Sequence, residues 1–119
     1  MRIEKELKDV ISEILPETSY GNAPIGPGWP RINFFRVSNP QHPTVDIQNP
    51  RFQISVRASS LGQAREIADN VRDRLHRLQG RMGNAYVNSI LVLNDNELYE
   101  QEAKVFHIPM TIKLQYKEV

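Results

Sequence analysis

The chain has 119 residues, and its 15 basic and 14 acidic side chains leave a formal charge of +1 near pH 7. This balance argues against a dedicated nucleic-acid-binding domain, which usually concentrates a basic excess on one face. The absence of Cys excludes disulfides, thiol nucleophiles and thiolate metal sites. The length suits one hydrophobic core, so we expect a single domain over residues 1–119.

The N-terminus is charged from its second residue and lacks the apolar segment of a signal peptide. No apolar run approaches the roughly 20 residues that are needed to cross a bilayer. We therefore expect a soluble cytoplasmic protein that makes no contact with a membrane.

The first predicted element is an amphipathic helix that ends at Pro16. Its apolar residues recur at helical spacing and comprise Ile3, Leu7, Val10, Ile11, Ile14 and Leu15. The following stretch, Glu17–Pro30, is rich in Gly and Pro and is expected to be an irregular connection. Trp29, near its end, either closes one end of the core or anchors a partner.

An aromatic, β-prone segment, Arg31–Ser38, predicts the first strand. The segment Asn39–Pro50 contains several prolines and is expected to form a protruding loop or a ragged hairpin tip. Val45 and Ile47 within it are apolar candidates for contact with another chain.

The strongest pattern is a strand followed directly by a helix, between Phe52 and Gln79. The strand alternates an apolar set with a polar one: Phe52, Ile54, Val56 and Ala58 against Arg51, Gln53, Ser55 and Arg57. The helix then repeats apolar residues at three- and four-residue spacing: Leu61, Ala64, Ala68, Val71, Leu75 and Leu78. Ser60 and Gln63 form a predicted capping box, and Gly80 is the predicted C-cap.

Two further strands are predicted, over Ala85–Leu93 and Ala103–Lys117. The last is the clearest strand in the chain, because its apolar residues alternate from Phe106 to Tyr116. Pro109 cannot donate a ladder hydrogen bond, which predicts that this strand lies at a sheet edge or is bulged there. Together the elements predict an α+β fold: an antiparallel four-stranded sheet, with or without an additional short strand, two helices packed on one face, and the order α-β-β-α-β-β.

No arrangement of residues points to catalysis. His42, His76 and His107 fall on a loop, a helix and a strand, without metal-ligand spacing, and His76 is expected to be a plain surface residue. The acidic residues after the third strand are expected to form a solvated turn: Asp95, Glu97, Glu100 and Glu102. No phosphate-binding loop or nucleophile elbow is present. We expect a non-enzymatic protein with no metal and no cofactor.

Four segments resemble the tail terminator family of long-tailed bacteriophages, also called tail completion or tail-to-head joining proteins. They are FQISVRASS from Phe52, AREIADNVRDRL from Ala64, ELYE from Glu97, and the alternating strand from Val105 to Tyr116. These are packing patterns. In that family they follow an N-terminal helix, an irregular Pro/Gly segment and a strand, so the resemblance covers nearly the whole chain in order.

The resemblance implies a structural virion protein, located in the tail or neck and assembled in the host cytoplasm. Members of that family form a homo-oligomeric ring, commonly a hexamer, that caps the tail tube, ends its polymerisation and meets head or neck connector proteins. The family has no invariant functional residue to carry over. From position alone, the candidate interface residues are Trp29, His42, Val45, Ile47, Arg51, Gln53 and Arg57.

A small hydrolase or nuclease that uses His107 with a nearby carboxylate stays open as an alternative. Two other functions, both non-enzymatic, also stay open at this stage. One is another head–tail connector or minor tail protein, with the ring at a different place in the virion. The other is a small nucleic-acid-binding α+β domain that uses the basic residues between Arg65 and Arg81, although acidic residues interleaved with them favour an ion-paired helix face.

Overall fold

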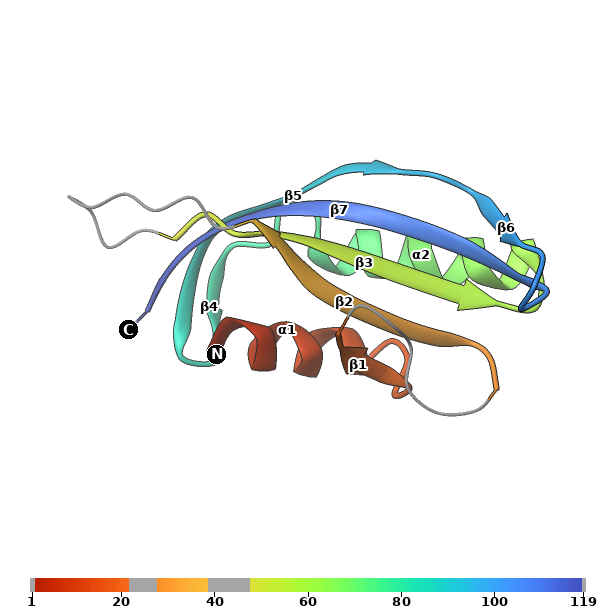
Figure 1. Ribbon diagram of the computed structural model, residues 1–119. Coiled ribbons are helices and arrows are strands. Elements are labelled where there is room, and N and C mark those ends of the chain that lie inside the picture. Colours follow the sequence, from red (N-terminus) through yellow and green to blue (C-terminus); the bar gives the residue numbers. More distant parts are fainter. Residues whose placement is uncertain (1, 22–27, 39–47, 119) are drawn as a thin grey trace.

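A computed structural model describes residues 2–21, 28–38 and 48–118 of the chain. Within these ranges the chain forms two helices and seven strands (Figure 1). In chain order they are α1 (Arg2–Ser12), β1 (Thr18–Tyr20), β2 (Arg31–Ser38), β3 (Arg51–Ala58), α2 (Leu61–Leu75), β4 (Gly80–Met82), β5 (Ala85–Asp95), β6 (Leu98–Glu100) and β7 (Val105–Glu118).

The strands form one strongly curled, mixed sheet with the order β1-β2-β3-β7-β5-β4, and β6 pairs with β7 beyond the end of β5. The β1–β2 pair is parallel and the other pairs are antiparallel. The predicted antiparallel four-stranded sheet with the order α-β-β-α-β-β is therefore wrong. The missed strands β1, β4 and β6 have three residues each, too few to show an alternation in the sequence.

A single core lies between the sheet and the two helices. The apolar residues of β3 and β7 are buried on the face toward the helices, as the alternation predicts. Residues of α1 and α2 join the same cluster, including Leu7, Ile11, Ala68 and Leu75. The opposite side of the sheet, called the outer face below, carries the polar set of β3.

The predicted start of α2 is confirmed, and its predicted end is wrong. The Ser60 side chain accepts a hydrogen bond from the Gln63 N–H at 3.2 Å. The helix ends at Leu75 with His76 as its C-cap, whereas Gly80 begins β4 with a φ of +108°. Leu78 still packs against the core, so the helical spacing continues beyond the helix itself.

Pro109 lies in the interior of the sheet, because β7 has β3 on one side and β5 and β6 on the other. The Pro109 carbonyl accepts a hydrogen bond from the Asn96 N–H at 3.3 Å, so this residue faces the junction of β5 and β6. Pairing is interrupted there between Asp95 and Leu98. The missing N–H of proline therefore falls where the ladder already has a gap, and an edge position is not required.

An ion pair at the border of the core fastens α1 to the sheet. Glu4 of α1 is only 5% exposed, and its carboxylate accepts a hydrogen bond from the Arg36 guanidinium on β2. The same guanidinium lies 5.6 Å from the centre of the buried Phe52 ring. Because the Glu4 side chain is only 6% exposed and that of Arg36 is 31% exposed, the Glu4 carboxylate depends on the Arg36 guanidinium for compensation of its charge.

Replacing Arg36 by Met should destabilise the fold, because it leaves the Glu4 carboxylate buried without its counter-charge. We expect the free energy of unfolding, measured by chemical denaturation, to fall by about 3 kcal/mol. Adding Glu4→Leu should recover most of that loss. The control is Lys5→Met, which breaks an exposed pair with Asp9 on the same helix and should have little effect. Similar effects of Arg36→Met and Lys5→Met would contradict the anchoring role of the buried pair.

Candidate interaction surfaces

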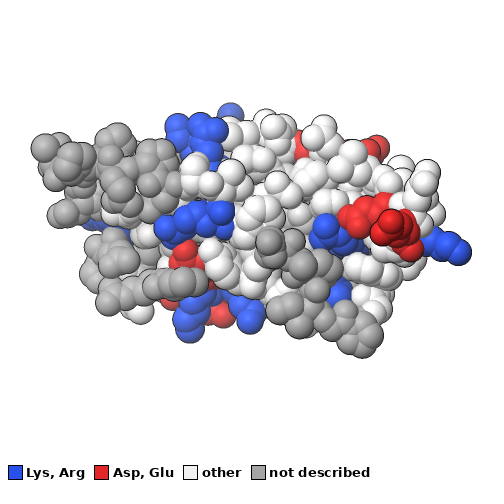
Figure 2. Space-filling model, in the orientation of Figure 1, with Lys and Arg blue, Asp and Glu red and all other residues white. Residues whose placement is uncertain are grey.

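The outer face of the sheet is not covered by either helix. In Figure 1 the strands β3 and β7 pass in front of α2, and Figure 2 shows the same side, with uncharged side chains over much of its middle and charged groups gathered toward its two ends. Arg51 on β3 and Lys113 on β7 are exposed and stand directly opposite each other in the register. The next pair along the strands is Gln53 and Thr111.

Exposed apolar side chains accompany these polar groups. Leu91 of β5 is 39% exposed and lies opposite Lys113, and Tyr86 is 46% exposed and lies opposite Lys117. Leu98 of β6, half exposed at 50%, lies opposite His107. Exposed Tyr and Arg side chains, which this face carries at Tyr86 and Arg51, are among the residue types enriched in protein-binding surfaces.

One end of the outer face holds a polar cluster contributed by four strands. Arg57 of β3 donates hydrogen bonds to Glu100 of β6 (2.8 Å) and to Asn33 of β2 (2.7 Å). His107 of β7 contacts the same Glu100 oxygen through Nδ1 at 3.0 Å. Asn33 in turn donates to the carbonyl of Gly21 at 2.9 Å. The cluster ties β2, β3, β6 and β7 together through side chains.

Burial lowers the pKa of His107 below its ordinary value, and the neighbouring Arg57 charge lowers it further. The Glu100 carboxylate acts in the opposite direction but does not reverse the shift. The geometry explains this result. His107 Nε2 is buried and has no hydrogen-bond partner among the described residues, so protonation would create an unpaired buried donor.

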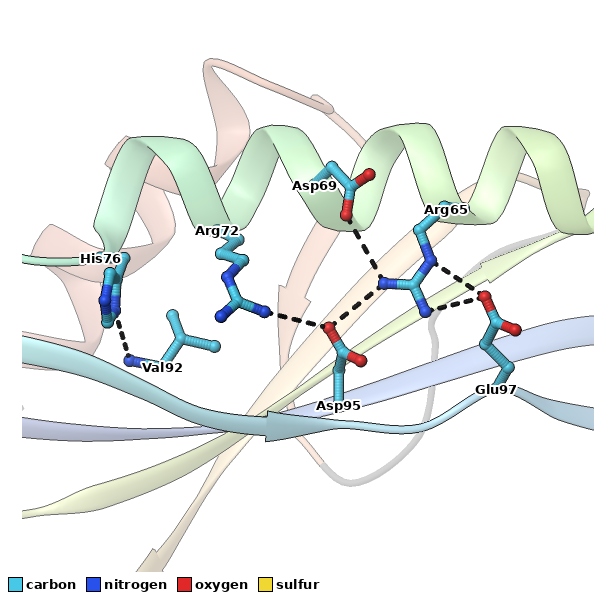
Figure 3. A network of polar contacts seen from close by, with 7 residues as sticks. All are labelled: Arg65, Asp69, Arg72, His76, Val92, Asp95 and Glu97. Atoms are coloured by element: carbon cyan, nitrogen blue, oxygen red, sulfur yellow. Dashed lines mark hydrogen bonds and ion pairs between the residues drawn. The ribbon is translucent and has the colours of Figure 1, made fainter.

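A second network joins α2 to the end of β5 (Figure 3). Arg65 donates two hydrogen bonds to Glu97 at 2.8 and 3.0 Å, and one to Asp95 at 3.2 Å. Asp95 also pairs at 3.5 Å with Arg72, which lies about two helical turns after Arg65 on α2. The two carboxylates raise the pKa of Arg65, which stays charged. Asp95 and Glu97 of the expected solvated turn are thus ion-paired to α2, and Glu100 belongs to the polar cluster with Arg57. Only Glu102 is exposed without an ion pair to any described residue.

The strand β4 pairs only with the first part of β5. The residues that directly follow α2 make hydrogen bonds to the next part of that strand edge. The Arg77 N–H donates to the Ile90 carbonyl at 2.7 Å, and the His76 Nδ1 accepts from the Val92 N–H at 3.0 Å. His76 is therefore not a plain surface residue: its ring takes the place of a backbone acceptor at a strand edge.

These contacts bear on the nucleic-acid alternative. Arg65 and Arg72 bind carboxylates of β5 and its turn, and Arg74 lies 3.6 Å from Glu13 of α1. The three basic residues of α2 are thus paired with acids within the molecule, which leaves less free positive charge for phosphate binding. Arg77 and Arg81, which follow the helix, are exposed and have no ion pair in the part of the chain that the structure describes. In the described ranges, no group of three His, Asp or Glu residues could hold a metal ion, and no helix is long and apolar enough to span a membrane.

The predicted interface residues fall into three groups. Arg51, Gln53 and Arg57 lie together on the outer face, but only Arg51 is fully exposed, and Arg57 belongs to the polar cluster. Trp29 is half-buried beside β2. The remaining three, His42, Val45 and Ile47, lie outside the described residues.

The sequence reasoning did not single out Lys113, Leu91 or Glu100 as members of this surface. The alternation of polar and apolar residues in β7 places Lys113 on the polar side of the strand, so its position on the outer face could have been predicted from the sequence. The cross-strand neighbours of each residue depend on register, which alternation alone does not determine.

The lowered pKa of His107 should make stability depend on pH. As the pH falls, the unfolded chain binds a proton near the ordinary pKa of 6.5, whereas the folded chain binds it only at lower pH. The contribution of His107 should therefore be constant above this value and decline below it. Urea denaturation between about pH 7.5 and 5.5 should show a shallower decline for His107→Gln than for the wild type. An unchanged decline in the variant would contradict this assignment.

Comparisons with known proteins agree with the resemblance seen in the sequence. No curated protein matches the chain. A similar solved structure is a chain from the "Virion of native gene transfer agent (GTA) particle", with a TM-score of 0.68 and 16% sequence identity. The alignment covers 97% of this chain and 91% of that one, so the two share their fold over nearly their whole length.

The family comparison is more specific. The model described as "Tail completion protein gp17" matches residues 7–117, which contain both described networks and every strand except the last residue of β7. The chain therefore belongs to the tail completion protein gp17 family and is a structural component of the phage virion tail.

Proposed function

We propose that copies of this chain form a closed ring that caps the phage tail tube, terminates its polymerisation and joins the tail to the head or neck. The observation that carries the proposal is the family match over residues 7–117, because completing a tail requires a protein that stops tube growth. The ring is homo-oligomeric, with six subunits as its expected number. The role is non-enzymatic.

A ring of this kind needs four contact surfaces on one small domain. Two connect neighbouring subunits, since a contact that closes by rotation joins two different patches. The others meet the tube on one side and the connector on the other. The core lies on one side of the sheet only, so the outer face and the solvent side of α2 are both available for such contacts.

The candidate contact residues are those predicted from the sequence. On the described part of the chain they are Trp29, Arg51, Gln53 and Arg57. The others lie in the segment 39–47. Tube protein and connector protein are the partners that these residues would meet, and no specific contact with nucleic acid is part of the role. Internal neutralisation of Arg65 and Arg72 supports that last point, because it leaves α2 with little free positive charge.

A phage in which this gene carries an early stop codon should make tail tubes of irregular, excessive length and heads without attached tails. The reason is that nothing then ends tube polymerisation or offers a surface to the head. Negative-stain electron microscopy of the lysate would measure tube lengths and the fraction of heads with tails.

Expression of the intact chain in trans is the matched control and should restore both uniform length and infectivity. Tubes of uniform length on infectious particles in the absence of the protein would overturn the proposal. Normal tube length with detached heads would reduce the role to joining alone.

A further inference from the structure

The solvent side of α2 carries an acidic stripe. Helix geometry places Glu66 and Asp73 about 180° around the helix from the buried residues Ala64, Ala68, Val71 and Leu75. Both acids are exposed, and neither has an ion-pair partner in the described part of the chain. Asp69 lies beside them and makes only a long contact with Arg65, 3.5 Å, so the stripe keeps its negative charge.

The outer face of the sheet carries the opposite charge. Arg51 and Lys113 stand directly opposite each other, an arrangement of like charges that weakens a strand pair. Lys117 extends the group along β7, and over the described residues none of these three cations is paired with an acid. The Arg57 charge further along is already neutralised by Glu100.

These two charged groups lie on opposite sides of the same two-layer domain. We propose that the basic patch (Arg51, Lys113 and Lys117) of one copy docks on the acidic stripe (Glu66, Asp69 and Asp73) of α2 in the next copy. The inference rests on the proposed ring and names the contact that closes it.

The spacing of the charges fits this contact. Glu66 and Asp73 are separated by two helical turns, about 10 Å along the helix. Lys113 and Lys117 are four residues apart on one strand, about 13 Å. Lys and Arg side chains are long enough to adjust to this difference, so two ion pairs can form at the same time. Leu91 and Tyr86 on the outer face lie opposite Lys113 and Lys117 and supply apolar area to the same contact.

The contact is heterologous, because each copy uses two different patches on opposite sides. Repetition therefore produces a ring or a filament, not a symmetric dimer. A symmetric dimer through the outer face would bring the basic patches of two copies together, and the charges disfavour it.

Charge reversal tests the contact directly. Variant A carries Arg51→Glu and Lys113→Glu, and variant B carries Glu66→Lys and Asp73→Lys. Each alone places like charges across every contact, so ring formation by light scattering or native mass spectrometry should weaken by at least about tenfold. Mixing A with B should restore rings in which the two variants alternate, because both kinds of contact are then attractive. A control with the same charge change as A, Lys8→Glu with Lys104→Glu, lies on neither surface and should assemble normally.

Cross-linking tests the same contact in assembled tails, including the case in which the free protein is monomeric. The natural chain has no Cys, so Asp73→Cys together with Lys113→Cys introduces the only thiols. In tails from a phage complemented with this variant, a short bis-maleimide should give a ladder of oligomers. Lys8→Cys together with Lys113→Cys should give none.

The results of these experiments distinguish a failure of the docking inference from a failure of the proposed tube-capping function. Rings that tolerate both reversals, or tails without a cross-linked ladder, would overturn the docking inference while the stop-codon phenotype still supports the capping role. Variant A that forms rings but loses tube or head attachment would assign the basic patch to another virion protein and would also overturn it. A normal tail in the stop-codon phage would instead overturn the function itself.

Discussion

Strand β7 is the element on which the rest of the structure depends, because it pairs with three other strands and supplies one side of the core. Its inward residues from Ile108 to Tyr116 are buried, and β3 and β5 are aligned by their register with it. The short β6 has no partner in the described sheet except β7. Once β7 is in place, the outward residues of three strands must share one outer face. Both the polar cluster and the basic patch follow from that placement.

The parts of the fold that sequence reasoning recovered are those with long, regular patterns. The β3–α2 unit was predicted with its N-cap, because eight residues of alternation and four helical turns each bury a recognisable set of side chains. The failures have a common physical origin in tertiary pairing. Strands of three residues are stabilised by their neighbours and show little of their own pattern. Pro109 was assigned to an edge or a bulge because only the lost donor was considered, whereas the matching gap between β5 and β6 is 10 or more residues away in the chain.

The side-chain networks were less predictable than the fold. Arg57 and Glu100 are 43 residues apart, and Arg65 and Glu97 are 32 apart, so no local spacing connects them. In the sequence the acids after β5 resemble an ordinary solvated turn, and the basic residues of α2 resemble a possible phosphate-binding face. In the structure Asp95 and Glu97 pair with Arg65 and Arg72 of α2. Glu100 instead pairs with Arg57 of β3, and Arg74 of α2 lies near Glu13 of α1. The combination explains why composition alone favoured neither an enzyme nor a nucleic-acid-binding domain: much of the charge serves to hold helix to sheet.

Among the charged side chains that have no ion-pair partner in the described ranges, Glu66 and Asp73 lie on one side of the domain, and Arg51, Lys113 and Lys117 lie on the opposite side. A chain with a net charge of only +1 exerts little long-range repulsion on its copies, which is compatible with the proposed ring. Local attraction then has to come from unpaired groups, and α2 and the outer face hold such groups with opposite sign. Surface ion pairs contribute little to stability on their own, so in the proposed contact their main effect is on orientation. A copy that presented its basic patch to the basic patch of its neighbour would be repelled. In the proposed contact, the apolar area beside the ion pairs would supply affinity, and the charges would decide which face meets which. A small domain with one core can in this way specify a directional contact, which is the requirement for a ring that closes.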